Sequence, residues 1–293
     1  MAETGYLTRI FRSWDVPGGR DLLGITTSTH YASTQSAVTV TLIAALLEQA
    51  MSPLPGRLLW QRMSIRDPGL IPHATGTDRL RLAMSQSQLW HRAAQAWARR
   101  YFEHLVVAFC RKTPRFPCSA PARRDSAIAR RNLIDRDGGR CAGTNRWCSI
   151  VPSRWRQPSG AGCVLAEAAH IIPHCVSNND QFTVVAEEYA GIAPWMIRGD
   201  AINHPRNLML LERDLHALLD RQHWGIEHVR ANQYGMRHVT VPPDFLVLRG
   251  LPESTAFHFG RGNNPAGWPN PEPRFVNLSL AVSRICRLAN VTT

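Results

Sequence analysis

The fold is decided by three segments, which read EAAHIIP (residues 167–173), NLMLL (residues 207–211) and DLHALLD (residues 214–220). The first two are short apolar runs of the kind that form strands, and the third has the spacing of an amphipathic helix. The sequence therefore predicts two strands followed by a helix. In that arrangement His170 lies at the end of the first strand, and His216 faces it from the helix across a small cleft.

The residue types in these segments suit the hydrolysis of a phosphodiester bond. That reaction needs a base to activate water and a cation to neutralise the charge that builds up on the phosphate. One histidine can act as the base near neutral pH, and a second, neutral histidine can hold the metal. His216 and Asp220 lie four residues apart, so they project from one helix face and could bind a single divalent ion together.

The three segments resemble the HNH nuclease family, and in particular the branch whose signature runs A-H-I-[IV]-P, N-x-x-x-L and D-L-H-x-x-x-D. That branch is abundant in filamentous fungi and some bacteria. The preceding RDGGRC at residues 136–141 is similar to the opening of the domain. The resemblance implies a ββα-metal fold in which His170 is the general base, His216 binds the metal and Asn207 braces the loop between the two strands.

The resemblance also implies a divalent metal cofactor, and members of the family use Mg, Mn, Ni or Zn. Many members place an Asp or a His immediately before the general base as a metal ligand, whereas this chain has Ala169. His216 and Asp220 remain as protein ligands, an arrangement that suits Mg²⁺ better than Zn²⁺. The alternative function is a catalytically weak or inactive module that binds nucleic acid, and Ala169 is the feature that favours it.

The charge of the chain also indicates nucleic acid as the partner, with DNA as the first expectation. The formal net charge is +12, and Lys112 is the only lysine among 34 basic residues. Arginine pairs with phosphate through two parallel hydrogen bonds, although GC-rich codon usage explains the same excess of arginine. Arg206 and Arg213 flank the second strand and the helix start, where a guanidinium could hold the scissile phosphate. For any single arginine, a solvated surface position is the commoner explanation.

Neither cysteine spacing nor apolar runs predict a secreted or membrane protein. The seven cysteines lack the dense, even spacing of a disulfide scaffold, so an intracellular location is expected, with the nucleus as one candidate. Residues 37–50 form the most apolar stretch, which is too short to cross a bilayer and predicts a buried helix. The expected state of the cysteines is the free thiol, because no structural zinc spacing links Cys141, Cys148, Cys163 and Cys175.

The predicted fold class is α+β, with four parts. A helical N-terminal region (1–110) is followed by a basic, proline-containing linker (111–130), an HNH nuclease domain (131–241) and an irregular C-terminal extension rich in Pro, Gly and Asn (242–293). Apolar periodicity predicts a long amphipathic helix over residues 77–112. That helix could be the docking face for a protein partner, with the nuclease as the effector.

Within the C-terminal half, short apolar runs predict strands and one helix before the tail. The only helix expected between Asp135 and the tail is residues 213–221, and a terminal helix is expected over residues 276–288. The long spacing between His170 and Asn207 predicts an insertion or lid over residues 176–205. The strand-like runs are residues 163–172, 207–211, 224–227 and 238–241.

Overall fold

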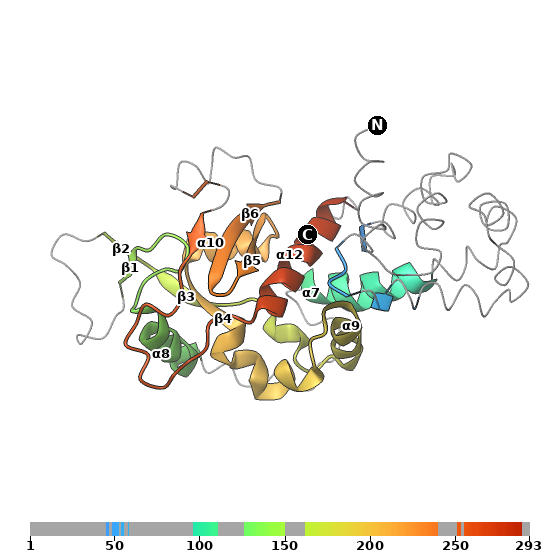
Figure 1. Cartoon of the computed structure of the whole chain (residues 1–293), viewed down its shortest axis with the longest axis horizontal. Helices are drawn as coiled ribbons and strands as arrows, with labels where there is room; N and C mark the ends of the chain where they lie inside the picture. The colour runs from blue at the N-terminus through green and yellow to red at the C-terminus, as the bar shows by residue number, and fades with distance from the viewer. Residues whose placement is uncertain are drawn as a thin grey trace, which may run out of the picture.

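The computed structural model of the chain describes residues 45–46, 49–52, 54–55, 58, 96–110, 126–149, 162–239, 251–252 and 255–288. These residues form helices and three small sheets, so the predicted α+β class is confirmed (Figure 1). Among them, no helix is both long enough and apolar enough to span a membrane.

The predicted order of strand, strand and helix is present. Strand β3 (Ala166–His170) pairs antiparallel with β4 (Leu208–Glu212), and α10 (Arg213–Asp220) follows β4 directly. The register sets His170 opposite Leu208. The predicted run over residues 163–172 is divided, because its first residues form β2 (Cys163–Val164), which pairs in parallel with β1 (Trp147–Cys148).

Both faces of the β3–β4 pair are covered. Side chains alternate between the two faces of a strand, so Leu208 and Leu210 of β4 point to one side, where they share an apolar cluster with Leu133 of α8 (Ser126–Asp137). Met209 and Leu211 point to the other side and join the main core. Helix α8 begins inside the predicted linker, so the last five residues of that linker are helical.

A buried ion pair closes the end of α8. Arg136 and Asp137 are 0% and 1% exposed, and two guanidinium N–H groups donate to the carboxylate, each at 2.8 Å. The other N–H groups of Arg136 donate to the carbonyl oxygens of Pro205 (2.8 Å), Pro269 (3.2 Å) and Leu208 (3.1 Å). All five donors of the guanidinium are thus used. One side chain joins α8, the start of β4 and the C-terminal segment.

The C-terminal segment crosses the end of α8 so closely that only glycine fits at the crossing. A Cβ atom on Gly262 would lie 2.0 Å from the backbone oxygen of Asp135. The backbone N–H of Gly262 donates to the carbonyl oxygen of Arg136 at 2.7 Å. Gly138 and Gly139, which end the helix, both have φ of 70°, a conformation that glycine adopts without strain.

A three-stranded sheet and the terminal helix lie beside this unit. Strands β5 (Trp224–Arg230), β6 (Gln233–His238) and β7 (Ala256–Phe257) form an antiparallel sheet, and α12 (Pro273–Leu288) packs against β5 (Figure 1). The predicted terminal helix is confirmed and begins three residues earlier, so the C-terminal extension is not irregular throughout. Its buried residues Phe275, Val282 and Ile285 are part of the main core.

The prediction of a strand at residues 238–241 was wrong, because β6 ends at His238. The turn after Arg230 sets where β6 begins, and pairing with β5 places Met236 opposite Ile226 in the core. The residues of β6 read QYGMRH, in which polar residues and a glycine hide the strand pattern. The predicted residues after 239 lie outside the described part of the chain.

The prediction that only residues 213–221 are helical before the tail was also wrong. Helix α9 (Asp180–Ala190) lies inside the predicted insertion. The Asn179 side chain accepts a hydrogen bond from the Phe182 N–H at 3.0 Å, and Gly191 ends the helix with φ of 65°. The β-branched residues 183–185 lower the intrinsic helix propensity, and burial of the apolar face outweighs that cost. Short 3₁₀ turns surround α9: η4 (His174–Val176), η5 (Pro194–Met196), η6 (Gly199–Asn203) and η7 (Pro205–Asn207).

Residues 96–110 are helical throughout and pack on α9. They comprise an α-helical stretch over residues 96–101, the π-helical turn η3 (Phe102–Val107) and α7 (Ala108–Cys110). The Tyr101 hydroxyl donates to Glu188 of α9 at 2.9 Å, and Arg100 makes two hydrogen bonds to the same carboxylate. The rest of the helix predicted over residues 77–112 lies outside the described residues. Of the helix predicted over residues 37–50, residues 45, 46, 49 and 50 are described. Residues 45 and 46 are helical and buried, whereas residue 49 lies in a turn and residue 50 in no regular element.

We expect Arg136→Lys to lower the free energy of unfolding by about 3–5 kcal/mol, because a lysine cannot supply five donors in a planar fork and leaves Asp137 underpaired. Urea denaturation of the full chain measures the loss. The matched control is Arg131→Lys on the exposed side of α8, which should change the same quantity by less than about 0.5 kcal/mol. Equal stability of the two variants would contradict the role given to Arg136.

Candidate active site

The imidazole of His216 lies between two carboxylates. Its Nδ1 atom is 3.1 Å from Oε2 of Glu167 on β3, and its Nε2 atom is 3.6 Å from Oδ1 of Asp220, one turn further along α10. Arg213, at the start of α10, has its Nε atom 3.8 Å from the other oxygen of Glu167. The His216 side chain is 23% exposed, so the cluster is open to solvent on one side.

Strand geometry explains how Glu167 reaches His216. Glu167 and Ala169 are two residues apart on β3 and therefore share the face that α10 covers. Ala169 is fully buried, opposite Met209 of β4, so the position where many HNH domains have a metal ligand is occupied here by core packing. Glu167 stands in the EAAHIIP segment, but sequence reasoning gave it no role. Glu167 lies two residues before Ala169, and alternate residues of a strand share one face. This spacing is the sequence signal that could have identified Glu167.

His170 belongs to a second group of polar residues. Its Nε2 atom is 3.0 Å from Oδ1 of Asn203, and its ring meets the ring of His174 edge to face with centroids 5.4 Å apart. Asn203 is the last residue of η6, so it comes from the predicted insertion. A neutral imidazole that donates its Nε2–H to Asn203 keeps its lone pair on Nδ1. Sequence reasoning missed Asn203, because no spacing in the insertion connects it to His170.

The side chain of Asn207 ties together the chain segments around His170. It is fully buried, and its Oδ1 atom accepts from the Ile172 N–H at 2.8 Å. Its Nδ2 group donates to the carbonyl oxygens of Ile172 and Ile202, both at 2.9 Å. Because Ile172 follows His170 and Ile202 precedes Asn203, this one amide fixes the backbone on both sides of the His170–Asn203 pair.

The structure places Arg206 beside His204. The Nε–H of Arg206 donates to Nδ1 of His204 at 3.1 Å, and the backbone N–H of Arg206 donates to the same atom at 3.2 Å. Burial, and then the charge of Arg206, lower the pKa of His204 below its ordinary value, which keeps the imidazole neutral as an acceptor at neutral pH. Arg206 and Arg213 thus lie in different surroundings, one beside His204 and one beside Glu167.

The donor set around His216 fits a divalent cation with few protein ligands. Within the described part of the chain, no group of three or more His, Cys, Asp or Glu side chains is arranged to hold a metal. Nε2 of His216 and Oδ1 of Asp220 are 3.6 Å apart. These two side chains would hold a divalent cation, because an imidazole nitrogen and a carboxylate oxygen are both donors that such cations accept. With Glu167 on the opposite ring nitrogen, the imidazole has the orientation that metal-bound histidines usually have.

The sequence match to known proteins falls on these elements. Residues 146–227 match a family model described as HNH endonuclease. This HNH segment contains β3, β4 and α10, and therefore His170, Asn207, His216 and Asp220. It is less than a third of the chain. No curated protein and no solved structure matches the chain. The match suggests a nuclease or nucleic-acid-binding function for the HNH segment.

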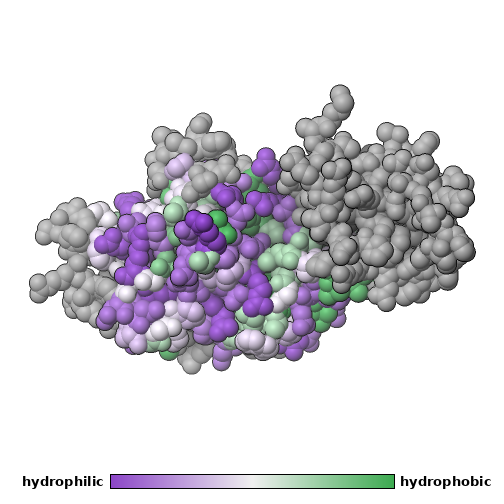
Figure 2. Space-filling view, viewed as in Figure 1, coloured by the Kyte–Doolittle hydropathy of each residue, from purple (hydrophilic) through white to green (hydrophobic). Residues whose placement is uncertain are grey.

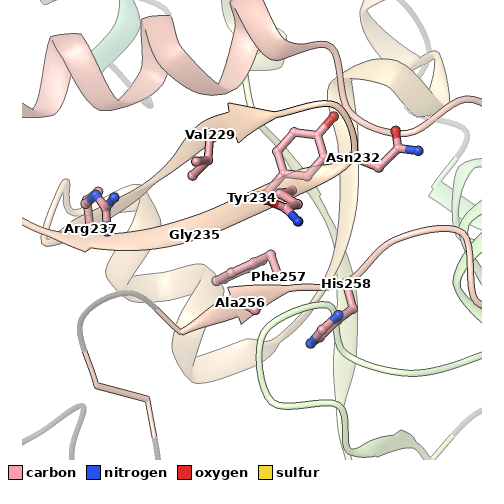
Figure 3. Close-up of a pocket in the computed structure, with 9 residues that line it drawn as sticks. Val229, Asn232, Tyr234, Gly235, Arg237, Ala256, Phe257 and His258 are labelled. Carbon is pink, nitrogen blue, oxygen red and sulfur yellow. The ribbon is translucent and has the colours of Figure 1, made fainter.

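A pocket of about 470 Å³ lies on the β5–β6–β7 sheet, and His170, Asn207 and His216 are not among its lining residues. Figure 3 shows Tyr234 and Arg237 of β6 on one side and Phe257 and His258 on the other. None of its lining residues belongs to β3, β4 or α10. Burial, and then the charge of Arg261, lower the pKa of His258.

Five of the described cysteines are free thiols and differ in exposure. Cys141, Cys148 and Cys286 are buried, Cys175 is half-buried and Cys163 is exposed. Burial, reinforced by the neighbouring Cys141, raises the pKa of the Cys148 thiol to about 12. Cys148 is therefore protonated and unreactive at neutral pH, as expected for a packed thiol. The sulfur of Cys141 accepts a hydrogen bond from the backbone N–H of Glu212, the last residue of β4, at 3.3 Å.

We expect Asn207→Ala to lower the free energy of unfolding by about 1–3 kcal/mol, because it leaves buried backbone groups of Ile172 and Ile202 without their partners. Thermal and urea unfolding of the full chain measure the effect. The matched control is Asn232→Ala on an exposed turn, which should stay within about 0.5 kcal/mol of the parent protein. Asn207→Ala as stable as Asn232→Ala would show that the amide does not brace this loop.

Proposed function

We propose that the protein is a metal-dependent HNH endonuclease that hydrolyses phosphodiester bonds of nucleic acid, with DNA as the expected substrate. The observation that supports it best is the fixed position of His216 between Glu167 and Asp220, on the helix beside the strand that ends in His170. The proposal includes the family branch with the A-H-I-[IV]-P signature and an intracellular site of action.

In this proposal His170 is the general base. With its Nε2–H donated to Asn203, the imidazole can accept a proton from water at Nδ1. The water then attacks phosphorus opposite the leaving 3′ oxygen, and the product carries a 5′-phosphate. Asn207 supports this step from a distance, because it holds the backbone around both His170 and Asn203.

The metal would be held by Nε2 of His216 and the carboxylate of Asp220. Glu167 would accept the Nδ1–H of His216 and leave the Nε2 lone pair directed towards Asp220. When bound, a divalent cation neutralises the charge on the phosphate and on the leaving oxygen. One imidazole and one carboxylate, completed by water and phosphate oxygens, suit Mg²⁺ first, and Mn²⁺, Ni²⁺ or Zn²⁺ after it.

Arg213 and Arg206 are the proposed contacts to the scissile phosphate. Arg213 is 70% exposed and shares Glu167 with His216, so a phosphate near His216 lies within the reach of its side chain. Arg206 immediately precedes Asn207 in the sequence, and neutral His204 orients its side chain. A guanidinium binds phosphate through two parallel hydrogen bonds, which would orient the phosphorus for attack.

A second candidate function is a nucleic-acid-binding module that has lost catalysis. Fully buried Ala169 favours it, because no carboxylate or imidazole stands at that position to strengthen metal binding. Under this alternative the β3–β4–α10 unit and the positive charge serve binding alone. The two functions differ in one measurable respect, which is cleavage that depends on added metal.

We expect His170→Ala to lower the rate of plasmid nicking by about 10²–10⁴-fold while DNA affinity stays close to that of the parent protein. A nicking assay measures the rate, and fluorescence anisotropy in EDTA measures the affinity. His228→Ala, on the β5–β6 hairpin, is the matched control and should nick like the parent protein. Full activity of His170→Ala would exclude this residue as the base.

We expect Glu167→Ala to weaken Mn²⁺ binding by about 10–100-fold, because the His216 ring loses the partner that orients it. Isothermal titration calorimetry on the full chain measures the affinity without any reference to cleavage. Glu167→Gln retains an acceptor for the Nδ1–H of His216 and should therefore lose less Mn²⁺ affinity than Glu167→Ala. Glu187→Ala on the exposed side of α9 is the control. The same Mn²⁺ affinity in Glu167→Ala and Glu187→Ala would remove Glu167 from the proposed site.

A further inference from the structure

Two arginines from distant parts of the chain converge on one neutral oxygen. Nη1 of Arg140 donates to Oδ1 of Asn145 at 3.4 Å, and Nη1 of Arg261 donates to the same oxygen. Asn145 has φ of 58°, a left-handed conformation that places its amide at the tip of an exposed turn. The two guanidinium groups are therefore held close together on the surface, and the group between them has no negative charge.

Neither arginine of this pair is in direct contact with a carboxylate among the described residues. Within the described residues, neither Arg140 nor Arg261 forms an ion pair with an acidic side chain. The pKa of Arg261 is lowered by burial first and then by the charge of Arg140, and Asp137 opposes the change. Two positive charges that share one hydrogen-bond acceptor repel each other, and an anion between them would relieve the repulsion.

Arg140 is also held in place by contacts other than Asn145. The guanidinium of Arg140 stacks on the Trp147 ring, 4.2 Å from the centroid. The backbones of Arg140 and Trp147 form an antiparallel bridge, so the base of the turn is fixed. Side-chain entropy that is lost on folding need not be lost on binding. A planar guanidinium that is already fixed, as that of Arg140 is, binds phosphate at a lower entropic cost than a mobile side chain.

The turn that carries Arg140 and Asn145 is attached to the proposed active site. The backbone N–H of Ala142 donates to the carbonyl oxygen of Leu210 in β4 at 2.8 Å, and Ala142 accepts from His258 at 3.1 Å. Arg146 on the same turn is 3.4 Å from Glu212, the residue that precedes α10. The face seen in Figure 2 is mostly hydrophilic over the described residues, with smaller apolar areas among them.

We propose that Arg140 and Arg261 form a phosphate clamp, which binds a backbone phosphate of the nucleic acid away from the bond that is cleaved. The clamp relies on the proposed function only for the identity of its ligand. Each guanidinium can give two parallel hydrogen bonds to phosphate oxygens. Contacts of this kind carry no base specificity, so the clamp would position the nucleic acid and leave sequence unread.

The test measures DNA affinity of the full chain in EDTA, where metal-dependent cleavage does not interfere. We expect Arg140→Gln/Arg261→Gln to bind a labelled DNA duplex roughly tenfold to a hundredfold more weakly at moderate salt. The plot of log K against log salt concentration has a negative slope, and we expect the magnitude of that slope to decrease by about 1 for each arginine removed. The matched control is Arg99→Gln/Arg198→Gln, which removes the same charge from arginines that are paired with Glu103 and Asp180.

A second variant tests the clamp without removing either arginine. Asn145→Asp places a carboxylate between the two guanidinium groups and keeps a residue that tolerates positive φ. We expect it to raise thermal stability slightly and to weaken DNA binding beyond the control variant. If Arg140→Gln/Arg261→Gln does not unfold cooperatively, and so is not properly folded, the DNA affinity of Asn145→Asp alone tests the clamp.

The outcomes separate the clamp from the proposed nuclease activity. Clamp variants that match the control in affinity and in salt slope would overturn the clamp, even if the parent protein cleaves DNA. A parent protein that never cleaves would overturn the nuclease proposal, and weaker binding by the clamp variants would still support the clamp. Unchanged DNA affinity in Asn145→Asp would also overturn the clamp.

Discussion

The guanidinium of Arg136 is the interaction on which the arrangement of the site depends. It is fully buried beside Asp137, and its five N–H groups reach the carboxylate and the carbonyl oxygens of Pro205, Leu208 and Pro269. A charge can be buried only when it is paired and its hydrogen bonds are satisfied, so these segments must meet at one point. The start of β4 is thereby fixed against α8, and β4 in turn sets β3 and α10.

The sequence predicted the parts of the fold whose signals are local. Residues 167–173 and 207–211 are apolar runs, residues 214–220 have helix spacing, and these elements are largely buried in the structure, so the order β3, β4, α10 could be predicted. Helix α9 could not, because tertiary packing outweighs the weak helix propensity of its β-branched residues. Its Tyr189 and Glu188 contact residues 46 and 100–101, and such partners are invisible without the fold.

The same distinction applies to the candidate site. His216 and Asp220 are four apart on one helix, so their proximity could be predicted from the sequence. Glu167 reaches His216 only through the pairing of β3 with β4 and the packing of α10, and Asn203 reaches His170 only because Asn207 fixes both backbones. Ala169 was noticed from the sequence as a departure, and its full burial gives the reason: the side chain at that position belongs to the core.

The fold and the activity therefore rest on different residues. Arg136, Asn207 and Ala169 build the β3–β4–α10 unit, whereas His170, His216, Glu167 and Asp220 would carry the chemistry. The most direct test of the activity is nicking of supercoiled plasmid by the full chain in Mg²⁺, Mn²⁺, Ni²⁺ and Zn²⁺ separately, with EDTA as the control. We predict open-circular product with at least one metal, Mg²⁺ first, and none in EDTA. Plasmid that stays supercoiled with every metal, while the protein still binds it, would contradict the nuclease and favour the binding module.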